Sequence, residues 1–125
     1  MKLKSLILIV LLIGLLACNN DDGIKKQIIE GEYVGIFERN GITSNVQLNL
    51  DDSGFSGESD TQKFPAICNG TYSISDNSIN FSNACIWTAD FDWTLILSKE
   101  WNFDFKNNTL VLVHSNGDKY TLTKQ

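Results

Sequence analysis

The sequence has few of the residues on which catalytic and metal-binding sites most often depend. Its 125 residues include one proline, one histidine and three cysteines. The single histidine, His114, excludes a metal site built from several histidines and leaves one candidate for a Ser–His or Cys–His pair. It stands at the end of an expected strand beside Ser115, where we expect an exposed histidine without catalytic function. We therefore predict no catalytic residues, no bound metal and no cofactor.

Positive charge is also scarce. The chain carries 10 Lys and Arg residues against 15 Asp and Glu residues, a formal net charge of −5. Removal of an N-terminal segment that contains Lys2 and Lys4 would leave 8 basic and 15 acidic residues, a charge of −7. A protein that neutralises phosphates needs the opposite balance, so nucleic acid is not expected as a partner. The length of 125 residues is sufficient for one domain only.

The longest hydrophobic run is too short to cross a membrane. It extends over the 11 residues from Leu6 to Leu16, whereas a spanning helix needs about 20. A short basic start with Lys2 and Lys4 followed by such a run is typical of a secretory signal peptide.

The end of this run resembles the lipobox of bacterial lipoproteins. It reads Leu15-Leu16-Ala17-Cys18, with Leu16 where a smaller residue is more usual. The resemblance implies that residues 1–17 are removed and that Cys18 carries a diacylglyceryl group, usually together with an acylated amine. Two or three acyl chains anchor a protein firmly, since each buried methylene contributes about 0.8 kcal/mol. The alternatives are a secreted protein with a free cysteine and an uncleaved membrane anchor.

Residues 18–30 are predicted to be the lipidated cysteine and a flexible tether. The polar start Asn19–Gly23 contains Asp21-Asp22, which resembles the acidic signals that send some Gram-negative lipoproteins to the cell surface. Asn19 is not the Asp that often retains lipoproteins in the inner membrane, so we expect the outer membrane, on its periplasmic or surface side. Residues 23–30 fit either one or two helical turns or the start of the first strand.

Hydrophobic residues in the rest of the chain recur mostly with a period of two. Val46, Leu48 and Leu50 alternate with polar residues, a pattern typical of antiparallel strands with one buried face. Short turns such as Asp76-Asn77 and Asn116-Gly117 separate most of these segments. Nine strands are expected, at 31–39, 44–50, 55–59, 70–75, 78–82, 92–97, 101–105, 109–114 and 118–124. Sequential hairpins favour an all-β, up-and-down antiparallel barrel of 8–9 short strands, and a β-sandwich is the alternative.

The region 31–125 resembles the small lipocalin-like barrels found among bacterial lipoproteins. The resemblance is carried by the opening Gly31-Glu32-Tyr33-Val34-Gly35-Ile36-Phe37 and by the meander that follows. Tyr33 stands where lipocalins place Trp in a Gly-x-Trp opening. The resemblance implies a small antiparallel barrel.

The side chains expected inside such a barrel are nearly all large, so we predict a mostly filled interior and a shallow site at one mouth. They are Tyr33, Phe37, Val46, Leu48, Leu50, Phe55, Tyr72, Ile74, Ile79, Phe81, Trp93, Leu95, Leu97, Trp101, Phe103, Phe105, Leu110, Leu112, Tyr120 and Leu122. A second apolar set would form an outer patch, covered by residues 24–29 or free to contact a protein. This set is Val34, Ile36, Ile96, Val111 and Val113.

Cys68 and Cys85 remain as a pair once Cys18 is lipidated. An even number of cysteines in an oxidising compartment predicts a disulfide. Its loop of about 17 residues would stabilise the fold by about 3 kcal/mol in a chain-entropy estimate. Two buried thiols or a redox pair are the alternatives.

The most distinctive stretch runs from Cys85 to Trp93 and has two carboxylates among three aromatic side chains. The functional interpretation is a site at the mouth, where Trp87 and Phe91 stack on a sugar or another flat ligand and Asp90 or Asp92 accepts hydrogen bonds. The structural alternative is a disulfide-tied loop whose aromatic side chains plug one end of the barrel.

From the sequence, we expect a lipid-anchored binding module of the bacterial envelope and not an enzyme. Its partners would be the membrane, through the anchor, and a small hydrophobic molecule, a glycan or an envelope protein. The alternative is a structural or inhibitory accessory protein that acts through protein contact. A mouth lined by Trp87 and Phe91 would favour the first, whereas a plugged mouth with an exposed patch from Val34 to Val113 would favour the second.

Overall fold

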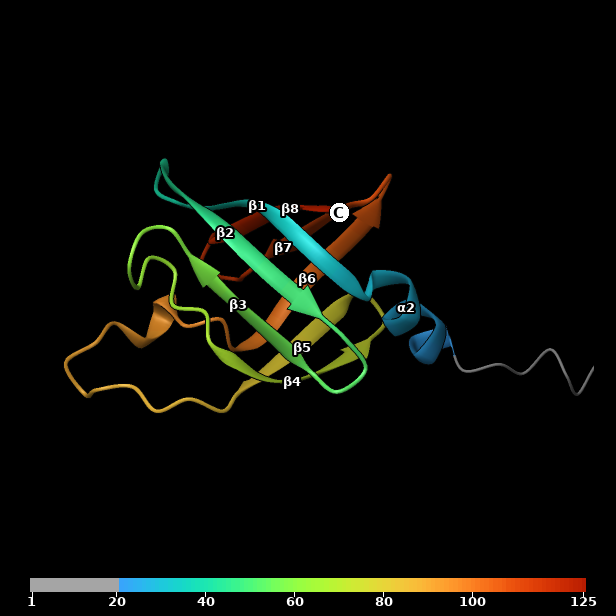
Figure 1. Ribbon diagram of the computed structural model, residues 1–125, viewed down its shortest axis with the longest axis horizontal. Coiled ribbons are helices and arrows are strands. Elements are labelled where there is room, and N and C mark those ends of the chain that lie inside the picture. The colour runs from blue at the N-terminus through green and yellow to red at the C-terminus, as the bar shows by residue number, and fades with distance from the viewer. Residues whose placement is uncertain (1–20) are drawn as a thin grey trace, which may run out of the picture.

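Eight antiparallel strands form a closed barrel in the computed structural model, which describes residues 21–125 (Figure 1). Each strand pairs with its neighbour along the chain, and the first strand pairs with the last. The strands are β1 (Gly31–Arg39), β2 (Ile42–Leu50), β3 (Phe55–Ser59), β4 (Asn69–Ser75), β5 (Ser78–Asn83), β6 (Lys99–Lys106), β7 (Thr109–Val113) and β8 (Lys119–Lys124). The up-and-down barrel is therefore confirmed and the sandwich is excluded. Cys18 and the expected signal peptide lie outside the described residues.

Closure of the barrel requires a close approach between β1 and β8. Gly35 lies opposite Leu122 in this pair. A Cβ atom on Gly35 would stand 2.0 Å from the carbonyl oxygen of Thr121, so only glycine fits here.

No helix in residues 21–125 is long and apolar enough to cross a membrane.

The prediction of a strand at 92–97 is wrong. Residues Trp93–Leu95 form a short 3₁₀ helix, η1, and only Ile96 makes an isolated bridge, with Ala66. The carboxylate of Asp92 accepts hydrogen bonds from the backbone N–H of Thr94 (3.0 Å) and its hydroxyl (2.6 Å), which favours a turn over an extended chain. Trp93, expected inside, is 57% exposed, and Ile96, expected outside, is only 5% exposed, whereas Leu97 is buried as expected.

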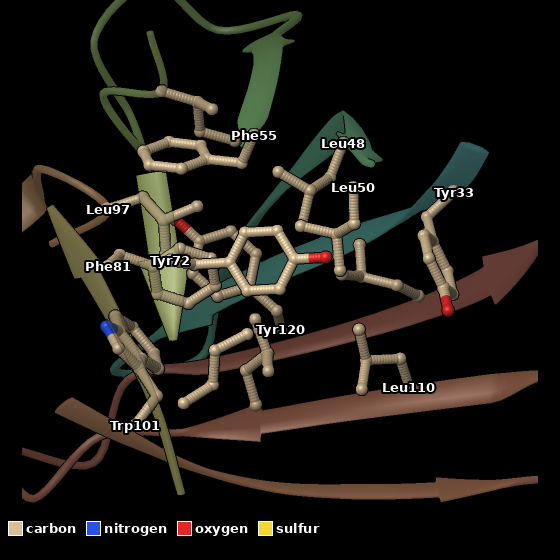
Figure 2. Packing of buried hydrophobic residues seen from close by; sticks show 14 of the residues in the cluster. Tyr33, Leu48, Leu50, Phe55, Tyr72, Phe81, Leu97, Trp101, Leu110 and Tyr120 are labelled. Atoms are coloured by element: carbon tan, nitrogen blue, oxygen red, sulfur yellow. The ribbon is translucent and has the colours of Figure 1, made fainter. Parts of the chain in front are cut away.

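Large side chains fill the barrel interior, as expected. Ile79, Leu110, Leu112 and Leu122 have no measurable exposure. Figure 2 shows Trp101 and Phe81 at one end of this core and Tyr33 at the other. The expected core residues that are only partly buried are Ile74, Leu95, Phe103 and Phe105.

The helix α2 (Asp21–Ile29) packs at one end of the barrel (Figure 1). Ile29 is 1% exposed, and its carbonyl oxygen accepts a hydrogen bond of 2.6 Å from the hydroxyl of Tyr33. Of the two possibilities for residues 23–30, the helix is the observed one, and its last residue belongs to the core. Since α2 closes an end, it does not cover the outer patch, where Val34 remains 45% and Val113 38% exposed.

The opposite end is plugged by two loop segments that run side by side. Ala66 donates a backbone hydrogen bond to Leu95 and accepts one from Leu97, both of 2.9 Å. The buried side chains of this plug are Ala66, Ile67, Ile96 and Leu97. Aliphatic residues therefore plug the mouth, and not the aromatic residues expected there. The disulfide Cys68–Cys85 is confirmed and ties the two loops together.

Candidate functional site

A cleft of about 600 Å³ lies beside the plug, where β5 and β6 separate. The two strands pair only as far as Phe81 and Lys99, and the chain between them, residues 84–98, leaves the sheet as a long loop. The cleft is lined by both strands, by this loop and by the residue after β7. Its lining residues are Phe81, Ser82, Asn83, Cys85, Ile86, Trp87, Trp93, Thr94, Ile96, Ser98, Lys99, Trp101 and His114.

All three tryptophans of the chain line this cleft. Trp101 is 3% exposed and packs edge-on against Tyr120, and its indole N–H donates to the carbonyl of Ser98 at 2.9 Å. The indole N–H of Trp93 donates to the carbonyl of Thr88 at 2.9 Å, which fixes the ring although it is exposed. The cleft thus has aromatic walls that are held in place by their own hydrogen bonds.

Trp87 differs from the other two tryptophans. Its Nε1 atom is buried, and no partner accepts its hydrogen among the described residues. A buried donor without a partner costs about 1–3 kcal/mol. Other atoms of Trp87 line the cleft, whereas its N–H is enclosed by the protein itself.

Phe91, predicted to stack on a ligand, stacks on Trp87 instead. The two ring centroids are 5.3 Å apart and the rings are inclined by 22°. The ammonium group of Lys63 lies 5.6 Å from the centre of the Phe91 ring. Phe91 therefore supports Trp87 from outside and does not line the cleft.

The two candidate carboxylates also lie outside the cleft lining. Hydrogen bonds from Thr94 lower the pKa of Asp92, and a hydrogen bond from Thr88 lowers the pKa of Asp90. Both carboxylates are thus held ionised by their own loop. Of the four predicted site residues, the structure places only Trp87 in the cleft.

Arg39 holds the rim of the cleft in place. It is the only arginine of the chain, and its Nε donates to the carboxylate of Asp118 at 2.7 Å. Its Nη2 donates to the carbonyl and hydroxyl oxygens of Thr94, both at 3.1 Å, and its Nη1 donates to Asp92 at 3.3 Å. One guanidinium therefore joins the end of β1, the turn before β8 and the η1 segment. A lone arginine beside the Asn40-Gly41 turn was the only sequence signal for it.

Sequence reasoning missed Lys99, Ser98 and His114 as cleft residues. The His114 ring lies 5.0 Å from Trp101, and its Nδ1 accepts a hydrogen bond of 3.2 Å from the backbone of Asn116. In this arrangement His114 donates only through Nε2. Within residues 21–125, no group of three or more His, Cys, Asp or Glu side chains is arranged to hold a metal ion.

The chain matches no protein family, no curated protein and no solved structure. The assignment of a small closed barrel therefore rests on the strand pairing in the structure and not on similarity to a known protein. The lipobox and the lipocalin-like opening remain resemblances carried by the residues quoted above.

Proposed function

We propose that this chain is a lipid-anchored binding module of the bacterial envelope, and that the cleft walled by three indoles holds a small, flat, largely apolar ligand. The observation that carries the proposal is the convergence of Trp87, Trp93 and Trp101 on one cleft. Its volume of about 600 Å³ falls within the range of about 300–1,000 Å³ that is usual for ligand pockets.

The filled barrel interior supports a site on the side of the barrel. Tyr33, Phe37 and Tyr120 are each 1% exposed, which leaves the centre to side chains. The site that we propose therefore lies where β5 and β6 diverge, beside the mouth at which the sequence predicted a shallow site. Aromatic walls with a few fixed polar groups are the usual lining of small-molecule sites.

Tryptophan fluorescence tests this proposal directly, because every tryptophan of the chain lines the cleft. The probe is N-phenyl-1-naphthylamine, a neutral aromatic fluorophore that accepts energy from excited indoles. We expect saturable energy transfer from the protein to the probe, and at least tenfold weaker binding to a Trp87→Ala variant. Absence of saturable transfer with the folded protein would refute the proposal.

We propose the lipid anchor because residues 15–18 resemble a lipobox that ends at Cys18. Removal of residues 1–17 and acylation of Cys18 would place the barrel at a membrane, for which we propose the outer membrane. Labelling with a palmitate analogue should mark the wild-type protein and not a Cys18→Ala variant. Equal labelling of both proteins would refute the lipid anchor.

A second candidate function is that of an accessory protein acting through protein contact. The observation that favours it is the plugged mouth together with Val34, Ile36 and Val113, which are 38–45% exposed on the outer face of β1 and β7. Double substitution Val34→Ser and Val113→Ser should leave probe binding unchanged if the cleft is the site. Loss of an envelope partner in this variant, with probe binding intact, would favour the second function.

A further inference from the structure

The charge of the cleft differs from that of the chain as a whole. No Asp or Glu side chain is among its described lining residues, and Lys99 is its one lysine or arginine. The cleft is therefore poor in negative charge, although the chain as a whole carries a net charge of −5.

Lys99 is free to meet an anion. Its side chain is exposed and makes no ion pair with any described residue. Glu100, which follows it on β6, does not line the cleft. The carboxylates of Asp90 and Asp92, on the loop before β6, accept hydrogen bonds from Thr88 and from Thr94 with Arg39.

The backbone of Lys99 is held in an unusual conformation. Its φ angle is +64°, a region that is strained for residues other than glycine. Of the other described non-glycine residues with positive φ, four are Asn or Asp, which tolerate this region well, and one is Lys63, which does not line the cleft. A strained lysine on the wall of a cleft is an arrangement found at functional sites.

Two polar side chains of the cleft, which could bind a sugar, already form hydrogen bonds within the protein. The amide of Asn83 donates to and accepts from the backbone of Cys85, at 2.8 and 3.4 Å. The hydroxyl of Thr94 donates to Asp92 at 2.6 Å. A polyol ligand, whose hydroxyl groups must donate hydrogen bonds, would find no carboxylate acceptor among the described lining residues.

We propose that the ligand of the cleft is a flat, apolar monoanion of the aromatic carboxylate class. Its ring would pack against the indoles of Trp87, Trp93 and Trp101, and its carboxylate would pair with Lys99. This inference rests on the proposed function and gives that function a ligand class.

An isosteric pair of ligands tests the charge preference. The probes are 1-naphthaleneacetate and its neutral amide, titrated into the full-length folded protein by calorimetry. An exposed ion pair contributes up to about 1 kcal/mol, so we expect the acid to bind about fivefold more tightly than the amide. Lys99→Gln should abolish this difference, and Lys99→Arg should restore it. Maltose, a neutral polyol, should not bind.

Lys106→Gln is the matched control, because Lys106 lies on the same strand, is exposed and does not line the cleft. It removes the same charge and should keep the preference for the acid. Equal binding of acid and amide to the wild-type protein would overturn the inference and leave the proposed function standing. A preference that persists in Lys99→Gln, or tighter binding of maltose, would also overturn the inference. Failure of both naphthalene probes and of N-phenyl-1-naphthylamine would overturn the proposed function with it.

Discussion

Arg39 and Asp118, 79 residues apart in the chain, form a paired contact through two nitrogens of the guanidinium and both oxygens of the carboxylate. Asp118 is 3% exposed, so this is a nearly buried ion pair. It joins the end of β1 to the turn before β8, and through Thr94 it also holds the rim of the cleft. The ion pair thus connects barrel closure to the shape of the candidate site.

Arg39→Ala should destabilise the fold, because it leaves the carboxylate of Asp118 buried without its cation. Breaking a buried pair costs about 3–5 kcal/mol, and the partial exposure of the Arg39 side chain (19%) places our expectation near the lower bound. Urea unfolding followed by far-UV circular dichroism measures the change. Lys119→Ala, which removes an exposed cation from the same hairpin, is the control and should shift the free energy of unfolding by less than about 0.5 kcal/mol. Equal effects of the two substitutions would contradict this role of Arg39.

Alkaline pH should destabilise the protein through its three tyrosines, all of which are buried. Burial raises the pKa of Tyr33 from 10.0 to about 12 and also raises the pKa values of Tyr72 and Tyr120. The fold favours the neutral phenols, so their contribution is complete below pH 10 and is lost progressively as the pH rises from 10 towards 12.

Absorbance at 295 nm, which reports tyrosinate, together with urea unfolding between pH 9 and 11.5, measures this effect. Little tyrosinate is expected at pH 10.5 while the protein is folded, and it should appear on addition of urea. A Tyr33→Phe variant should show a weaker dependence on pH. Tyrosinate formation near pH 10 in the folded protein would contradict the prediction.

Reduction of the disulfide Cys68–Cys85 should cost about 3 kcal/mol of stability, as expected for a closed loop of 17 residues. It should also weaken binding in the cleft, because Cys85 lines it. Urea unfolding and probe titration with and without dithiothreitol measure both effects. A Cys68→Ala, Cys85→Ala double variant is the control, and its stability should not respond to the reductant.

Ile29→Ala should destabilise the barrel by about 2–3 kcal/mol, since a buried isoleucine is truncated at the end of the core. Ile28→Ala is the matched control on the same helix, where the side chain is 50% exposed, and a change within about 0.5 kcal/mol is expected. Thermal unfolding of the two variants distinguishes them. Equal stability of both would mean that α2 acts only as a tether.

The barrel could be predicted from the sequence because its signals are local. A period of two in β2, β6 and β8, with a turn between neighbouring strands, determines which face of each strand is buried. The pairing of Cys68 with Cys85 was predicted from the assignment of Cys18 to a lipid anchor, which leaves two cysteines. In contrast, the alternation of Trp93, Leu95 and Leu97 predicted a strand, and the hydrogen bonds that Asp92 accepts from Thr94 turn that segment into η1.

The candidate site was only partly visible in the sequence. Trp87 and its loop stood out by composition, but Lys99, Trp101 and His114 belong to other elements and carry no local signal. Eight of the nine predicted strands and the buried face of most of them could be read from the sequence, because alternation and turns depend on neighbouring residues. The aliphatic plug and the meeting of the indoles beside it could not, because the divergence of β5 from β6 depends on contacts between distant segments.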